Sequence, residues 1–249
     1  MNQLINLNKK LAVVTGGTRG IGKAISLALL EAGARVIITG TTQKKEETIK
    51  QEFDSENIEY YQSDFGDEKS LQGFLEYLRS LKKIDILVNN AGINKLNLVS
   101  DISLSEYNDV LDINLKAPFL ITQEVSQLMI NNKGGKIVNI TSIWSSVSRK
   151  ERAMYSMSKW GLAGFSKSTA IDLAEHNILV NSVAPGFTLT ELTEQTNTKE
   201  ELRILEDKIP MRRLADPKEI ANLVLFLSSE LNTYLTGQNI IIDGGYTSL

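Results

Sequence analysis

The sequence predicts an α/β fold in which seven parallel strands form a doubly wound sheet with helices on both faces. Along its 249 residues, short runs of β-branched and apolar residues alternate with longer stretches of helical periodicity. Several short runs are almost continuously apolar, as expected for strands that are covered on both faces. Because strand–helix alternation implies right-handed crossovers, the sheet is predicted to be parallel.

Seven segments are predicted to be strands, at 11–15, 35–39, 58–62, 84–88, 136–140, 178–183 and 239–242. Helices are predicted at about 21–32, 43–53, 67–82, 103–131, 152–176 and 217–229. Two helix starts carry local signals. Ser103 and Glu106 have the spacing of a capping box. Asp216-Pro217-Lys218-Glu219 supplies an N-cap, a first-turn proline and an acid at the third helical position.

Composition excludes several classes of site. The formal net charge is -3, so the chain lacks the basic footprint of nucleic-acid binders. With no cysteine and one histidine, His176, it cannot form disulfides, thiolate sites, histidine clusters or a histidine-based triad. We therefore expect no metal centre. The first residues lack a signal-peptide pattern and no run of about 18 apolar residues occurs, so we expect a cytoplasmic protein without a membrane span.

No low-complexity linker or internal repeat divides the chain, and we expect a single domain over 1–249. The segment at about 187–208 interrupts the strand–helix rhythm and is rich in Thr, Glu, Gln and Asn. Insertions of this kind are often functional, so the segment is interpreted as a substrate lid. The alternative is a plain solvated helical excursion.

A glycine-rich segment from Thr15 to Gly22 follows the first predicted strand and opens the first helix. Glycines at Gly16, Gly20 and Gly22 allow a tight turn, close approach of the backbone to a pyrophosphate, and close helix–sheet packing. The start of the helix adds free N–H groups and the positive end of its dipole. The segment is therefore a candidate dinucleotide-phosphate loop.

These glycines have the spacing TGxxxGxG, and with this motif the chain resembles the short-chain dehydrogenase/reductase family. The resemblance continues in order along essentially the whole chain, through Asn89-Asn90-Ala91-Gly92, Tyr155-Ser156-Met157-Ser158-Lys159, Pro185-Gly186 and Asp243-Gly244-Gly245. Within the family, the chain is most similar to β-ketoacyl-acyl carrier protein reductases. The resemblance implies a Rossmann-like three-layer α/β/α fold and oxidoreductase activity with a nicotinamide cofactor.

Three features favour NADP(H) over NAD(H). No acid stands at the carboxyl end of the second strand, between Arg35 and Thr42, where NAD sites usually place Asp or Glu. Arg19 lies inside the loop, where its guanidinium could pair with a 2′-phosphate. Thr41 and Thr42 could add hydroxyl donors. The alternative is that Arg19 is only a solvated loop residue.

The resemblance assigns further cofactor contacts. Asp64 matches the family position that faces the adenine amino group, or alternatively only turns the chain. Phe65 stands where the family often has valine, and the backbone amide of Thr188 would meet the carboxamide. The complete predicted cofactor set is Gly16, Thr18, Arg19, Gly20, Ile21, Gly22, Thr41, Asp64, Phe65, Asn90, Ala91, Gly92, Tyr155, Lys159, Pro185, Gly186 and Thr188.

Tyr155 and Lys159 are four residues apart on a predicted helix and so share one face. Tyrosine titrates near ~10, and a neighbouring ammonium would favour the phenolate. By resemblance, Ser142 hydrogen-bonds the substrate carbonyl, Tyr155 delivers the proton and Lys159 also holds the nicotinamide ribose. Asn114 matches the family asparagine that bends its helix and positions a water for proton relay.

The substrate is less well determined. The leading hypothesis is reduction of 3-oxoacyl groups on acyl carrier protein, and the alternative is oxidation or reduction of a sugar or polyol. A non-catalytic dinucleotide sensor is a third reading, which the intact catalytic set argues against. Lys133 and His176 match basic positions expected at the active-site entrance for an acidic carrier protein.

Residues near the catalytic set admit several readings. Arg149, Lys150 and Arg152 could add basic charge for the carrier, form a solvated loop, or bind a phosphorylated sugar. Trp144 and Met154 either line the pocket or fill the core.

The helices at 103–131 and 152–176 carry apolar residues over arcs wider than one buried face requires. These residues include Leu111, Ile113, Phe119, Ile121, Val125, Leu162, Phe165 and Ile171. Relatives pair these helices across a two-fold axis, and the apolar segment 238–249 could form a second contact. We predict a homotetramer with D2 symmetry, or failing that a homodimer. Burial within one subunit is the competing explanation.

Overall fold

Seven parallel strands form one sheet in the order β3-β2-β1-β4-β5-β6-β7 in the computed structural model, which describes residues 4–191, 193 and 198–248. The strands are β1 Leu11–Val14, β2 Arg35–Gly40, β3 Ile58–Gln62, β4 Ile86–Asn89, β5 Gly135–Ile140, β6 Ile178–Pro185 and β7 Asn239–Ile242. The predicted parallel seven-stranded sheet is confirmed. β3 and β7 match their predicted ranges, and the ends of the other strands differ by one or two residues.

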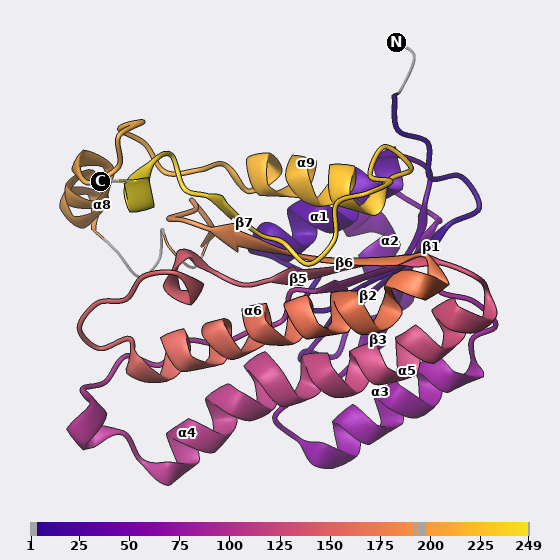
Figure 1. Ribbon diagram of the computed structural model, residues 1–249, viewed down its shortest axis with the longest axis horizontal. Coiled ribbons are helices and arrows are strands. Elements are labelled where there is room, and N and C mark those ends of the chain that lie inside the picture. The colour runs from indigo at the N-terminus through magenta and orange to yellow at the C-terminus, as the bar shows by residue number, and fades with distance from the viewer. Residues whose placement is uncertain (1–3, 192, 194–197, 249) are drawn as a thin grey trace.

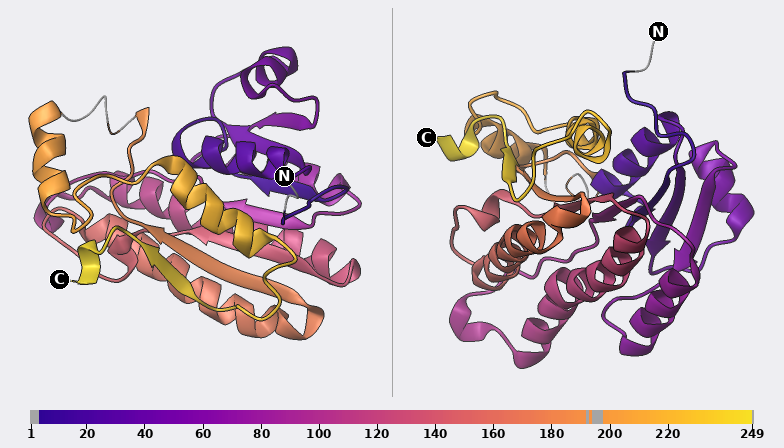
Figure 2. Two further views of the ribbon diagram at one scale, coloured as in Figure 1. Left: turned by 90° about the horizontal axis from the view of Figure 1, so that it is seen from above. Right: turned by 45° about the vertical axis from the view of Figure 1, so that its right-hand side comes forward.

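Helices cover both faces of the sheet (Figures 1 and 2). They are α1 Gly20–Glu31, α2 Glu46–Phe53, α3 Glu68–Ser80, α4 Leu104–Leu111, α5 Ala117–Asn131, α6 Ala153–Leu173, α8 Lys199–Asp207 and α9 Pro217–Ser228. One buried cluster joins the sheet to α1, α2 and α9, and a second joins the opposite face to α3, α5 and α6. Successive side chains of β1 point to opposite faces of the sheet, since Ala12 and Val14 belong to the first cluster and Val13 to the second.

The predicted helix 103–131 is a composite. A five-residue π-helical segment, Asp112–Lys116, separates α4 from α5. Such segments occur often at functional sites, and this one contains the fully buried Asn114. The predicted capping box at Ser103–Glu106 is present, and Asp216, predicted as an N-cap, forms a capping box with Glu219.

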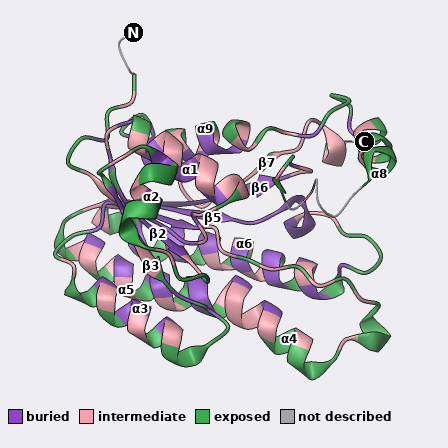
Figure 3. Cartoon of the chain, turned by 180° about the vertical axis from the view of Figure 1, so that it is seen from behind, coloured by how far each residue is buried: buried purple, intermediate pink, exposed green. Residues whose placement is uncertain are grey.

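The segment at about 187–208 is predicted to be a substrate lid. Its structure includes α8, which begins at a capping box between Thr198 and Glu201 and contains no buried residue. Figure 3 shows α8 as a mainly exposed helix at one end of the molecule. Residues 192 and 194–197 lie outside the described residues, so the lid remains a prediction. Among the described residues, no helix combines the length and the hydrophobicity that a membrane span requires.

The topology places the candidate site. The sheet grows from β1 toward β2 and β3 on one side and toward β4 to β7 on the other. In such sheets ligands bind beyond the carboxyl ends of the strands, at the point where the strand order reverses. The phosphate loop follows β1, and Asn90 follows β4, so the predicted motifs meet at this switch point.

Candidate active site

The phosphate loop connects β1 to α1 and depends on its glycines. Gly16 and Gly20 have positive φ angles of 62° and 53°, a conformation that L side chains rarely adopt. A Cβ on Gly22 would lie 2.2 Å from the carbonyl oxygen of Gly16. The loop therefore keeps its shape only without side chains at these positions, as the sequence predicted.

Asn90 ties the turn after β4 to this loop. Its Nδ2 donates to the carbonyl oxygens of Thr15, at 2.9 Å, and Gly16, at 3.0 Å. The backbone amides of Asn90 and Ala91 donate in return to Oγ1 of Thr15, at 2.9 and 3.0 Å. A Cβ on Gly92 would lie 3.5 Å from Nζ of Lys159. The same turn thus borders both the loop and the catalytic residues.

The residues predicted to select NADP(H) lie at the end of β2. Arg19 precedes α1 as its N-cap residue and is exposed, and within the described part of the chain its guanidinium forms no hydrogen bond or ion pair. Thr18 packs near Gly40, whose Cβ would lie 3.0 Å from Cγ2 of Thr18. The carbonyl of Thr41 accepts a 3.1 Å hydrogen bond from Nε2 of Gln62. Thr41 and Thr42 are exposed after β2, and the Thr18 contact joins this end of β2 to the loop that carries Arg19.

Asp64 and Phe65 take different positions after β3. Asp64 is exposed, and its Oδ1 accepts a 2.9 Å hydrogen bond from the backbone amide of Gly66. The chain-turning role considered for Asp64 is therefore present. The ring of Phe65 is buried, with its centroid 5.7 Å from that of Phe74. Because the ring is buried, a contact of Phe65 with the adenine, which stays a prediction, would be made mainly by its main chain.

The segment after β6 closes the other side of the loop. The backbone amide of Gly186 donates to the carbonyl of Ile242 at 2.9 Å, and a Cβ on Gly186 would lie 2.7 Å from Cβ of Asp243. Thr188 is buried and donates from Oγ1 to the carbonyl of Gly186 at 3.2 Å. Ile21 is partly buried against the core of the first face.

Ser142, Tyr155 and Lys159 converge at the carboxyl end of β5. Ser142 lies two residues beyond β5, and Tyr155 and Lys159 lie on the first turns of α6. Nζ of Lys159 is 5.6 Å from the centroid of the Tyr155 ring and donates to the carbonyl of Ile140 at 2.8 Å. The structure thus brings the predicted catalytic set together.

The electrostatics of this set differ from the sequence expectation. Burial lowers the pKa of Lys159 from 10.5 to about 8. Burial also raises the pKa of Tyr155 above 10, while hydrogen bonding to Ser142 and the charge of Arg152 act in the opposite direction. We expected Lys159 to lower the pKa of Tyr155. In this structure the cation that favours the phenolate is Arg152, and burial outweighs it.

Asn114 is held by the chain itself. Its Nδ2 donates to the carbonyl of Ile93 at 2.9 Å and to Oγ of Ser158 at 3.1 Å, and its Oδ1 accepts from the amide of Ile93 at 2.8 Å. Ser158 donates in turn to the carbonyl of Tyr155 at 2.7 Å. Sequence reasoning missed Ser158, which links Asn114 to α6. A water contact of Asn114 remains a prediction.

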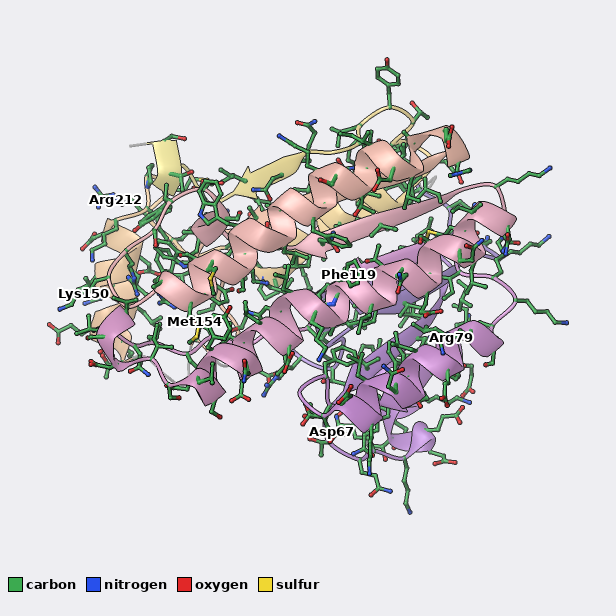
Figure 4. All side chains as sticks on the ribbon, turned by 60° about the horizontal axis from the view of Figure 1, so that its bottom comes forward. Asp67, Arg79, Phe119, Lys150, Met154 and Arg212 are labelled. Atoms are coloured by element: carbon green, nitrogen blue, oxygen red, sulfur yellow. The ribbon has the colours of Figure 1, made fainter. Side chains whose placement is uncertain are left out.

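The basic run before Tyr155 is not uniform. Arg149 and Lys150 are exposed, whereas Arg152 is 9% exposed. Lys150 and Met154, both labelled in Figure 4, lie at the end of the molecule where α6 begins. Trp144 and Met154 are both buried, so neither presents much surface to a solvent-filled pocket.

Lys133 and His176 do not flank the entrance of this site. Lys133 follows α5 and precedes β5, and His176 precedes β6. Both therefore lie at the amino ends of strands, opposite the edge where Ser142 follows β5. The expectation that they form an entrance within the same chain is wrong, because residues that directly precede parallel strands lie at the edge opposite the ligand crevice.

Comparisons with known proteins agree on one family. The family model described as enoyl-(acyl carrier protein) reductase matches residues 16–247. The 3-oxoacyl-[acyl-carrier-protein] reductase of Aquifex aeolicus is 41% identical over 245 residues, covering 97% of this chain and 98% of that protein.

Solved structures of similar proteins extend the comparison. A putative gluconate dehydrogenase from Agrobacterium tumefaciens superposes with a TM-score of 0.92 at 32% identity, covering 99% of this chain and 100% of the other. A gluconate 5-dehydrogenase from Burkholderia cenocepacia, in complex with NADP and tartrate, gives a TM-score of 0.90 at 29% identity over 98% and 97% of the two chains.

Proposed function

Because this chain belongs to the short-chain dehydrogenase/reductase family, we propose that it transfers hydride between NADP(H) and a carbonyl carbon, with 3-oxoacyl groups on acyl carrier protein as the leading substrates. The observation that carries this proposal is the convergence of Ser142, Tyr155 and Lys159 beside the phosphate loop. Its 3-oxoacyl-[acyl-carrier-protein] reductase relatives support the substrate class.

Each catalytic residue has a role that its surroundings support. The nicotinamide supplies the hydride when it is bound. Ser142 holds the carbonyl oxygen, and Tyr155 donates a proton to it as negative charge develops. A tyrosine whose pKa is raised is protonated at neutral pH, which suits a proton donor. Lys159 orients the ribose, and Asn114 fixes the π-helical segment beside it.

The chain is an NADP(H)-dependent enzyme, and we assign the cofactor contacts as follows. Glycines of the loop admit the pyrophosphate, and Arg19 with Thr18 and Thr41 receives the 2′-phosphate. Asp64 and the main chain of Phe65 meet the adenine. The turn Asn90-Ala91-Gly92 and the segment Pro185-Gly186 with Thr188 border the nicotinamide side. The NADP complex of the Burkholderia relative supports this cofactor.

A second candidate is oxidation or reduction of sugar acids and polyols. The gluconate dehydrogenases among the similar structures support it, as does a specific observation, the buried and unpaired Arg152 beside Tyr155. A non-catalytic sensor is a weaker candidate, because it would not need Ser142, Tyr155 and Lys159 together.

The test is NADPH oxidation by the purified protein, followed at 340 nm with a panel of 3-oxoacyl thioesters, keto-sugars, keto acids and simple ketones. We expect turnover with at least one class, and none with the Tyr155→Phe variant on the same substrate. NADPH binding without turnover across the panel would instead favour the sensor.

We further propose that the protein forms a homotetramer through the outer face of α4, α5 and α6. Ile121, Val125 and Leu162 are buried within the subunit, so they do not support an interface. Other apolar residues on these helices stay exposed, namely Leu104, Phe119, Met157, Trp160 and Ile171, and Figure 4 places Phe119 on this outer face.

The second contact of the proposed tetramer involves β7, the edge strand at one end of the sheet, where Ile241 is exposed. The Tyr246 ring packs against Trp144 and Phe187 of its own chain, and Leu249 lies outside the described residues. Light scattering at micromolar concentration tests the assembly. We expect four chains per particle and a smaller species for Ile171→Glu, whereas an active monomer of 27.6 kDa would contradict the proposal.

A further inference from the structure

Three charged side chains are buried in the part of the chain that the structure describes: Asp85, Arg152 and Lys159. Asp85 is paired with Lys83 at 2.8 Å and with Lys10 at 3.9 Å, and it accepts from the amide of Leu11 at 2.9 Å. Lys159 donates to the carbonyl of Ile140. The guanidinium of Arg152 forms no hydrogen bond or ion pair with the described residues, and its Nε is fully enclosed without a partner.

An unpaired buried cation is costly, because desolvation is not offset by a counter-charge or by hydrogen bonds. The chain does provide an apolar support: Cζ of Arg152 lies 5.6 Å from the centroid of the Trp144 ring, and Cζ of Arg149 lies 5.5 Å from it. The adjacent carboxylate, Glu151, is exposed and forms no ion pair with Arg152. The charge of Glu151 acts on Arg152 only through space, Arg149 adds a second positive charge, and no described residue pairs directly with the Arg152 guanidinium.

The position of Arg152 connects this charge to the reaction. Arg152 is three residues before Tyr155, and its charge acts on the Tyr155 hydroxyl. Trp144 is two residues after Ser142, and its backbone amide donates to Oγ of Ser142 at 3.3 Å. The guanidinium therefore lies against the ring of Trp144, whose backbone is bonded to Ser142, and is close enough to Tyr155 for its charge to act on the hydroxyl.

We propose that Arg152 is a specificity-determining residue that binds the carboxylate of a small keto-acid substrate while its ketone is held by Ser142 and Tyr155. This inference rests on the proposed carbonyl reduction. The planar guanidinium fits a carboxylate through two parallel hydrogen bonds, and one buried cation is neutralised by one monoanion. A dianionic phosphate would leave a net negative charge in the same place, so a carboxylate is the better match.

The reaction balances without further components. Hydride passes from NADPH to the ketone carbon and a proton passes from Tyr155 to the ketone oxygen. The products are the hydroxy acid and NADP⁺, and Tyr155 regains its proton from solvent. The carboxylate is unchanged and serves only to orient the substrate. In the opposite direction, the same site oxidises a hydroxy acid.

The experiment compares acids with neutral partners that carry the same ketone: acetoacetate with ethyl acetoacetate, and 5-ketogluconate with L-sorbose. In the wild type we expect kcat/KM to favour at least one acid by tenfold or more. In Arg152→Met the ratio of acid to neutral partner should fall about ten- to hundredfold, the loss typical of one charge-assisted contact. Arg149→Met is the matched control, since it removes an exposed arginine from the same tryptophan ring, and it should leave the ratio unchanged.

Two further measurements separate this role from a structural one. Arg152→Met removes an unpaired buried charge, so its melting temperature should equal or exceed that of the wild type. Arg152→Lys keeps the charge but loses the planar fork, and it should give an intermediate ratio. A lower melting temperature, with equal losses on acids and neutral ketones, would show that Arg152 is only structural.

Failure of the inference and of the proposed function are distinguishable. If neutral ketones or thioesters are reduced with no preference for acids, or dihydroxyacetone phosphate is preferred, the inference is overturned and carbonyl reduction stands. If nothing in the panel is reduced, the proposed function fails. Calorimetric titration of acetoacetate and 5-ketogluconate into the enzyme–NADP⁺ complex then tests separately whether Arg152 binds a carboxylate. Weaker binding of either acid to Arg152→Met supports the inference, and no difference between the variants for both acids overturns it.

Discussion

The phosphate loop at 15–22 and the start of α6 at 152–159 border the same edge of the sheet but are built differently. In the loop, side chains are absent where the backbone must turn or approach closely, as at Gly16 and Gly22. At the start of α6, charges are buried without acidic partners, as at Arg152 and Lys159. The loop therefore offers a backbone surface to a ligand, whereas the start of α6 offers buried positive charges that a negatively charged ligand could neutralise.

This structural difference between the loop and the start of α6 determines how substitutions in each should act. Changes in the loop should act through sterics and contacts with the cofactor, and their effects should vary little with pH. Changes near the start of α6 should act through protonation and charge, and should depend on pH and on the charge of the substrate. The predictions below separate these two behaviours.

The largest expected effect is on turnover in Tyr155→Phe. Removing the hydroxyl removes the proton donor, and general acid catalysis typically contributes about 10²–10⁴-fold. We expect kcat to fall by that factor while NADPH affinity, measured by fluorescence titration, changes little. Tyr234→Phe removes the hydroxyl of a tyrosine that is 95% exposed and should have no effect. Wild-type turnover in Tyr155→Phe would exclude Tyr155 as the acid.

The second prediction concerns cofactor choice at the loop. Arg19→Ala should weaken NADPH binding by roughly 1.5–3 kcal/mol, the usual contribution of a hydrogen bond to a charged group, and should leave NADH affinity nearly unchanged. Isothermal titration with both cofactors measures this. Arg203→Ala removes an exposed arginine from α8 and should change neither affinity. Tighter binding of NADH than of NADPH by the wild type would contradict the assignment of Arg19.

Sequence reasoning succeeded where the determinants are local. The strand ranges of β3 and β7, the capping box at Ser103 and the N-cap at Asp216 follow from alternation and spacing within a few residues. The glycine positions in the loop were also predictable, because a tight turn has the same requirement in any context. The π-helical segment does not follow from periodicity, because its insertion barely alters the apolar pattern of 103–131, and only the family resemblance indicated a bend at Asn114.

What sequence reasoning missed depends on tertiary packing. Arg149, Lys150 and Arg152 look alike in the sequence, and only packing against Trp144 buries one of them. Likewise the sign of the pKa shift of Tyr155 depends on burial, which spacing to Lys159 does not reveal. Sequence reasoning therefore named Ser142, Tyr155 and Lys159, which the structure brings together, but neither Ser158 nor the electrostatics of the site.

The third prediction is a pH dependence of stability caused by Lys159. Its pKa is about 8 in the folded protein against 10.5 for a free lysine, so between these values the unfolded chain binds more protons. Stability therefore rises with pH across this window as the destabilisation from the buried charge disappears. Relative to Lys159→Met, the wild type should gain roughly 2 kcal/mol of unfolding free energy between pH 7 and pH 10.

Urea denaturation of the cofactor-free protein at several pH values measures this difference. Lys167→Met, at an exposed position on the same helix, is the control and should give a parallel pH profile to that of the wild type. A pH-independent difference between wild type and Lys159→Met would mean that the folded state does not perturb Lys159.

The smallest expected effects come from glycine substitutions, which test the steric character of the loop. In Gly22→Ala the new methyl would lie 2.2 Å from the Gly16 carbonyl, a backbone atom that cannot move without distorting the loop. We expect a loss of at least about 1 kcal/mol of stability together with weaker NADPH binding.

Gly73→Ala, within α3, is the control, because its new methyl meets only the Tyr61 hydroxyl at 3.4 Å, an ordinary contact. It should stabilise the protein by roughly 0.5–1 kcal/mol, because alanine favours helix more than glycine does. Both differences should stay constant from pH 6 to 9, since no titrating group is involved. Equal effects of the two substitutions, or a pH-dependent effect of Gly22→Ala, would show that the loop is not governed by shape.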